Sequence, residues 1–121
     1  EIKRAVFSTA PGIRSSLWNL VTEAIGTFVL VFGALSITSA DNSLGSLDAL
    51  PVGLLVLGIG LALGGPTGYA INPARDLGPR IAHAILPIQG KGDSDWGYAW
   101  IPVMGPIAGG LVAAACYGML A

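Results

Sequence analysis

The chain has 121 residues, of which 53% are hydrophobic and 11% are charged, and its formal net charge is −1 at pH 7. Soluble domains carry about 25% charged residues, so this composition indicates a membrane protein. The charge balance offers no basic surface for a nucleic acid partner. The sequence has no phosphate-binding loop, no nucleophile-and-base pattern and no cluster of metal ligands, so we expect neither an enzyme nor a cofactor.

Three apolar segments are long enough to form transmembrane helices, at about residues 17–39, 50–67 and 99–120. A polar, mixed segment, residues 1–16, precedes the first of them. Glycines within these segments let helix backbones approach closely, as in small-xxx-small pairs. The pattern predicts an all-α membrane protein.

A few residues stand out against these apolar segments. Glu23 is the only charge in the first one, and an unpaired carboxylate in hydrocarbon is costly. It either lies at the membrane interface or accepts backbone N–H groups inside the protein. Trp96, Tyr98 and Trp100 are typical of an interfacial aromatic belt. The lone Cys116, in an apolar helical run, indicates packing.

A polar stretch between the second and third apolar segments predicts a re-entrant loop and half-helix at about residues 68–85. Asn72 is a good N-cap residue and Pro73 suits the first helical position. The helix that follows is too short to span a bilayer. Irregular backbone at membrane depth is tolerated only where protein buries it or where it lines a water-filled cavity. The stretch is therefore the candidate functional site.

Charged and titratable residues follow the half-helix start. Asp76 and Arg80 stand four residues apart with the acid first, which favours an ion pair. We expect an exposed pair that braces the half-helix and contributes about 0.2–0.5 kcal/mol. His83 falls late in the helix, where we expect a solvated side chain or a cap on the helix C-terminus.

The motif Asn72, Pro73, Ala74, Arg75, Asp76, followed by Gly-Pro-Arg at residues 78–80, resembles the second Asn-Pro-Ala signature of the aquaporin (major intrinsic protein) superfamily. Asp after the Arg is similar to the glycerol-facilitator, or aquaglyceroporin, branch. The resemblance implies three transmembrane helices and one re-entrant half-helix, corresponding to the second inverted repeat of the aquaporin fold. Since the family pattern has two such motifs, residues 1–121 resemble its C-terminal half, either a fragment or part of a split protein.

The resemblance also implies roles for particular residues. Arg75 donates hydrogen bonds at the narrowest point, Tyr69 forms an aromatic wall beside it, and Gly60 leaves room opposite. Asn72 donates near the membrane midplane. The remaining implied residues are carbonyl acceptors exposed on the loop (Gly68, Tyr69 and Ala70) and structural supports (Glu23, Asp76, Arg80 and Pro102).

The function implied is a passive channel for glycerol, similar small neutral polyols and water, once the chain is combined with an N-terminal half. A multi-pass protein of the cell membrane and a homotetramer are implied as well. Two alternatives stay open: half of a water-selective channel, and a non-conducting structural or assembly fragment. The residues that argue against water selectivity are Gly60, Tyr69, Asp76, Arg80 and Pro102.

Overall fold

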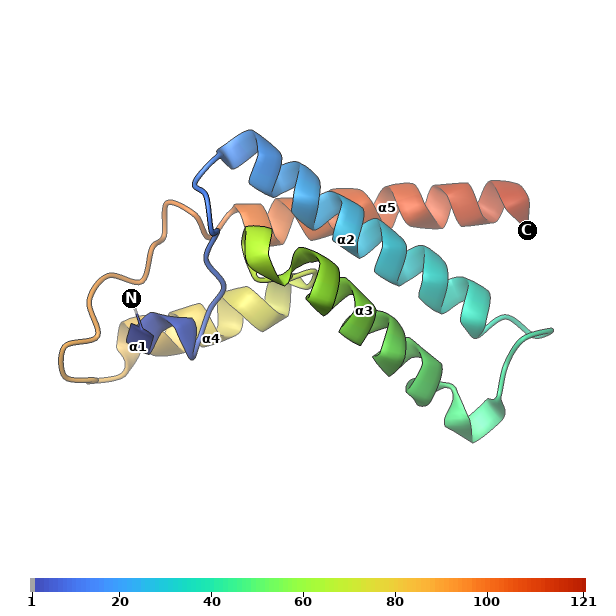
Figure 1. Ribbon diagram of the computed structural model, residues 1–121, viewed down its shortest axis with the longest axis horizontal. Helices are drawn as coiled ribbons and strands as arrows, with labels where there is room; N and C mark the ends of the chain where they lie inside the picture. Colours follow the sequence, from blue (N-terminus) through green and yellow to red (C-terminus); the bar gives the residue numbers. More distant parts are fainter. Residues whose placement is uncertain (1) are drawn as a thin grey trace.

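The computed structural model describes residues 2–121, so only Glu1 of the expected polar segment lies outside it. The described residues form helices and connecting segments, with no strand among them. The helices are α1 (Ile2–Ala5), α2 (Ser16–Ile37), α3 (Ala49–Thr67), α4 (Pro73–Ile85) and α5 (Ile101–Leu120), with one 3-10 turn at Gly45–Leu47 (Figure 1).

The three long helices are apolar enough to cross a membrane by length and composition. α2 packs against both α3 and α5. The contact with α5 is close because it is made at glycines: a Cβ on Gly109 would lie 2.1 Å from the Ala24 carbonyl oxygen, and one on Gly105 would lie 2.7 Å from Glu23 Cβ. Small residues of this kind let two helix backbones touch in a membrane.

Large apolar side chains cover the outer faces of these helices. On α3 and α5 they include Leu54, Leu57, Leu61, Leu111 and Val112, all exposed in the isolated chain. Exposed apolar surface of this extent marks contact with a membrane or with other protein. The fold is therefore that of a multi-pass membrane protein.

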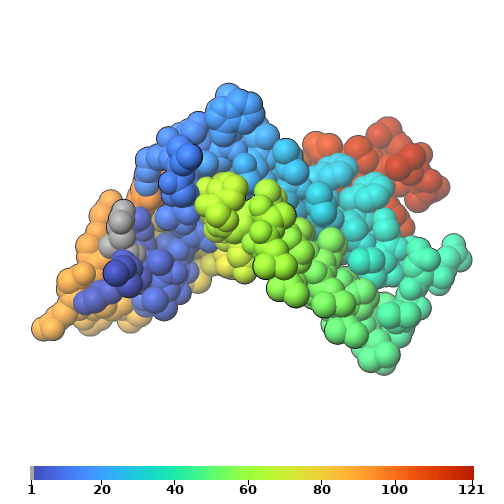
Figure 2. All heavy atoms as spheres, in the orientation of Figure 1, coloured from blue at the N-terminus to red at the C-terminus, as the bar shows by residue number. Residues whose placement is uncertain are grey.

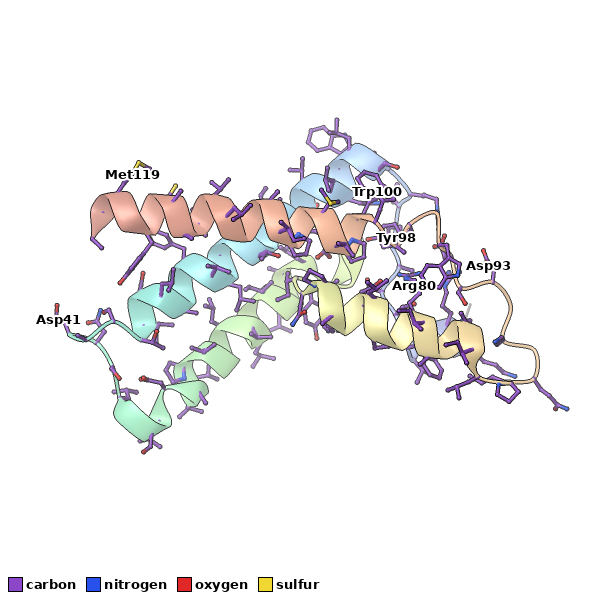
Figure 3. The ribbon with its side chains drawn as sticks, turned by 180° about the vertical axis from the view of Figure 1, so that it is seen from behind. Asp41, Arg80, Asp93, Tyr98, Trp100 and Met119 are labelled. Atoms are coloured by element: carbon purple, nitrogen blue, oxygen red, sulfur yellow. The ribbon has the colours of Figure 1, made fainter. Side chains whose placement is uncertain are left out.

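The half-helix α4 lies at one end of the bundle and packs against α5. α3 ends at Thr67 and is capped by Gly68, whose φ of 73° is in the left-handed region that glycine adopts without strain. Residues 69–72 then lead into α4, which begins at Pro73. Figure 3 shows Arg80 and Asp93 at this end of the molecule and Asp41 and Met119 at the other.

The N-terminal segment packs against the same end rather than standing free in solvent. Ser8 and Thr9 are buried, and the Gly12 N–H donates to the Pro66 carbonyl at 3.0 Å. Lys3 donates to the Gln89 carbonyl, and Arg14 is paired with Asp95. Figure 2 shows this segment, in dark blue, against the orange residues of the loop between α4 and α5.

Candidate functional site: the re-entrant loop and half-helix

Glu23 holds the loop from α2. Its side chain is completely buried, its Oε1 accepts the Ala70 N–H at 3.0 Å, and its Oε2 accepts the Ile71 N–H at 2.7 Å. Hydrogen bonds to an ionised acceptor are roughly twice as strong as neutral ones. The interfacial position that the sequence left open for Glu23 is wrong, because this carboxylate lies inside the protein.

Asn72 caps α4. Its φ of −160° is extended, and its Oδ1 accepts the N–H groups of Ala74 at 2.9 Å and Arg75 at 3.3 Å. Pro73 occupies the first helical turn, where its missing N–H costs nothing. Because Oδ1 is engaged, the Asn72 amide NH₂ is the group left to donate to anything passing this exposed residue.

Arg75, Tyr69 and Gly60 come together from the half-helix, the loop and α3. The Arg75 guanidinium carbon lies 4.9 Å from the centre of the Tyr69 ring, a cation–π distance. The other face of the site is α3, where a Cβ on Gly60 would lie 3.0 Å from Tyr69 Cζ. Any side chain at position 60 would therefore push against the ring.

The loop carbonyls differ from expectation at one position. Gly68 and Tyr69 are half-buried and keep exposed surface. Ala70 has no exposed surface, so its carbonyl is buried, contrary to the prediction. The reason is the contact with Glu23, which draws this part of the loop into the protein; the observed polar contact of Ala70 is its N–H.

The Asp76–Arg80 pair is buried, contrary to the expectation of an exposed pair. Both side chains have no exposed surface, and Arg80 donates from Nε and Nη2 to the carboxylate at 2.8–2.9 Å. The sequence-based estimate of its energy therefore does not apply. Breaking a buried pair by removing one partner costs about 3–5 kcal/mol, because a charge is left uncompensated.

The pair also binds two segments that are distant in the sequence. Thr9 donates to Asp76 Oδ1 from its N–H at 2.7 Å and from its hydroxyl at 2.6 Å. Arg80 donates to the carbonyls of Thr9 at 2.9 Å, Ser94 at 2.7 Å and Asp95 at 3.2 Å. The sequence analysis missed these three residues, since no local pattern marks them as partners of the pair.

Tyr98 is buried beside Arg80, contrary to the prediction that it is part of an aromatic belt (Figure 3). The Arg80 guanidinium carbon lies 5.9 Å from the centre of its ring. Burial, followed by the nearby carboxylates of Glu23 and Asp76, raises the pKa of the Tyr98 hydroxyl far above its usual value. Trp96 and Trp100 are each about half exposed, at 48% and 46%, and their place in an aromatic belt stays a prediction.

His83 is buried as well, so the expectation of a solvated or capping side chain is wrong. Its Nδ1 lies 2.8 Å from Ser94 Oγ, and its ring meets that of Phe7 edge to face at 5.5 Å. The C-terminus of α4 is capped by Lys91 instead, whose ammonium donates to the carbonyls of Ala84 and Leu86 at 2.7 Å each.

Pro102, expected as a structural support, is buried in the first turn of α5.

A hollow of about 510 Å³ opens beside Arg75. It is lined by residues 5–10 together with Gly68, Arg75 and Pro79. Arg75 is exposed and is one of the residues that line this hollow.

Three apolar helices long enough to cross a membrane, with a capped half-helix and a carboxylate-held loop at one end, define a multi-pass membrane protein. The family model described as Major intrinsic protein matches residues 2–117, and the chain belongs to this family.

The relatives found by sequence and by structure agree with this assignment. The chain is 57% identical over 115 residues to glycerol uptake facilitator protein 3 of Lactiplantibacillus plantarum, covering 95% of this chain and 48% of that protein. It is 58% identical over 120 residues to the probable glycerol uptake facilitator protein of Thermotoga maritima, covering 99% and 51%. The X-ray structure of the aquaglyceroporin from Plasmodium falciparum superposes with a TM-score of 0.81 at 30% identity, covering 92% and 48%. The chain thus spans about half the length of the relatives it matches.

Proposed function

We propose that this chain forms, together with an N-terminal half, a passive channel for glycerol and similar small neutral polyols that also passes water. Residues 1–121 would be the second repeat, with α2, α3 and α5 as its spans and residues 68–85 as its re-entrant unit. The relatives of similar sequence carry the name glycerol uptake facilitator, which supports the proposal.

The observation that carries the proposal is the Tyr69 ring seated between Gly60 and Arg75. Glycerol has hydroxyls along one edge and carbons along the other. The Arg75 guanidinium offers a planar fork of donors for the hydroxyls. The Tyr69 ring offers an apolar wall for the carbons, and Gly60 leaves the ring its place.

The same residues account for the cations that we expect the channel to exclude. Arg75 and the positive N-terminal end of α4 both repel cations, an arrangement described for aquaporin-type pores in general. The half-helix has 13 residues, too few to span a bilayer, and we propose that its N-terminus lies inside the complete channel. We further propose that the complete channel is a homotetramer of the cell membrane and has no enzymatic activity.

Flux measurements on the full-length channel in proteoliposomes test the proposal. Stopped-flow light scattering should show glycerol and water flux above that of bare lipid. Gly60→Ala should lower glycerol flux more than water flux, because the new methyl meets the Tyr69 ring. Gly58→Ala is the matched control on the same helix, since a Cβ there has no neighbour within 4 Å. Fast water flux with no glycerol flux would favour the water-selective alternative, and no flux of either would favour a non-conducting fragment.

A further inference from the structure

Thr9 touches the re-entrant unit at two places, at its first residue, Gly68, and in the first turn of α4, at Asp76. Its side chain packs on Gly68, where an added Cβ would lie 3.2 Å from Thr9 Cβ and 3.3 Å from its Cγ2. Its N–H and hydroxyl both bind Asp76. Gly68 is the residue immediately before Tyr69, and Asp76 is the residue immediately after Arg75. Thr9 therefore bridges the two backbone positions that border the Tyr69–Arg75 pair.

The bridge is tightly held on the side of the half-helix. Thr9 makes three hydrogen bonds to the buried ion pair, two to Asp76 and one from Arg80 to its carbonyl. All of these groups are buried, so solvent cannot readily replace a lost partner. Arg80 in turn is fixed by the carbonyls of Ser94 and Asp95, which anchors the bridge to the loop before α5.

The rest of the N-terminal segment contacts Pro66, Gln89 and Asp95, whereas Thr9 binds the half-helix one residue after Arg75. Residues 8–15 are outside any helix, yet residues 5–10 line the hollow beside Arg75. A change at Thr9 would therefore act on this lining together with Gly68 and the first turn of α4.

We propose that Thr9 is a positioning residue for solute discrimination, which fixes the spacing of Tyr69 and Arg75 by joining Gly68 to the Asp76–Arg80 pair. Thr9 acts through those two side chains and needs no contact with the solute. The inference rests on the proposed glycerol conduction. It assigns selectivity to a residue that lies 66 positions before Arg75 in the sequence.

The test is the ratio of glycerol to water flux, and of erythritol to glycerol flux, in proteoliposomes of the full-length channel. Thr9→Val keeps the shape that packs on Gly68 but removes the hydroxyl donor to Asp76. We expect it to change both ratios severalfold. Thr9→Ser restores the hydroxyl and should return the ratios toward wild type. Thr38→Val is the matched control, because the Thr38 hydroxyl donates only to the Ala34 carbonyl at the far end of α2.

A merely structural role would lower every flux in the same proportion and leave both ratios at the wild-type value, which would overturn the proposal. If Thr9→Val does not reach the membrane, Thr9→Cys, with a weak S–H donor on a side chain of similar size, should change the ratios in the same direction, and unchanged ratios would again overturn it. A wild-type channel that passes no glycerol would instead contradict the proposed function itself.

Discussion

Glu23 satisfies two consecutive loop N–H groups with one carboxylate, in a place where apolar side chains and lipid could accept neither. Replacing Glu23 with Ala would leave both N–H groups without an acceptor. Each buried donor left unpaired costs about 1–3 kcal/mol. We expect Glu23→Ala to lower the melting temperature of the detergent-solubilised full-length channel markedly, and Glu23→Gln, which keeps one acceptor oxygen, to lower it less. A Glu23→Ala protein that melted and conducted like the wild type would show that the loop does not depend on this carboxylate.

Arg80 neutralises Asp76 and holds three carbonyls, so its loss should be costly. We expect Arg80→Met to destabilise the channel by about 3–5 kcal/mol, because the Asp76 carboxylate would remain buried without its counter-charge. Arg14→Met is the control: Arg14 is also paired with an aspartate, Asp95, but its side chain is 59% exposed. Because Arg14 is exposed and Arg4 also lies 3.9 Å from the Asp95 carboxylate, we expect a smaller loss than for Arg80→Met. Thermal unfolding of both variants checks this, and equal losses of stability would contradict the importance of burial.

Among the helices, the contact between α2 and α5 should be the least tolerant of added volume. A methyl group on Gly109 would lie 2.1 Å from the Ala24 carbonyl oxygen, and backbone cannot move aside as a side chain can. Overpacking of this kind costs about 1–3 kcal/mol or more. We expect Gly109→Ala to reduce the yield and the melting temperature of the channel. Gly118→Ala, on the same helix with no neighbour within 4 Å, should behave like the wild type.

The elements were predictable from local sequence to different degrees. The lengths of the apolar segments indicated α2, α3 and α5, and the Asn72-Pro73 start indicated α4, because span length and capping are local properties. The burial of Asp76, Arg80 and His83 was not predictable in this way. The groups that cover them come from residues 7–9 and 94–95, and nothing in the spacing of α4 itself reveals these partners.

The residues of the candidate site were likewise predictable to different degrees. An acceptor role for Glu23 followed from the cost of an unpaired carboxylate in an apolar helix, together with the family resemblance. The meeting of Tyr69, Gly60 and Arg75 was expected from the resemblance alone. Thr9 was not predicted, because a threonine in a polar segment has no feature that marks it as the partner of a buried aspartate 67 residues away.

For the whole molecule, the apolar faces of α3 and α5 are exposed, and the chain spans about half the length of the relatives it matches. The proposed glycerol pathway needs a second wall opposite Arg75, which we expect the N-terminal half to supply. Arg75 is the residue through which the proposal can be tested most directly, since it combines the donor fork with the fixed positive charge.

The decisive measurement is therefore solute flux combined with a pH-sensitive dye in liposomes that carry the full-length channel with Arg75→Ala. We expect a wider constriction without its charge, so that discrimination among polyols falls and protons leak. Arg75→Lys should not restore the wild-type behaviour, because an ammonium lacks the planar fork of a guanidinium. An Arg75→Ala channel with the same solute selectivity and the same proton tightness as the wild type would contradict the proposed role of Arg75 and the pathway built around it.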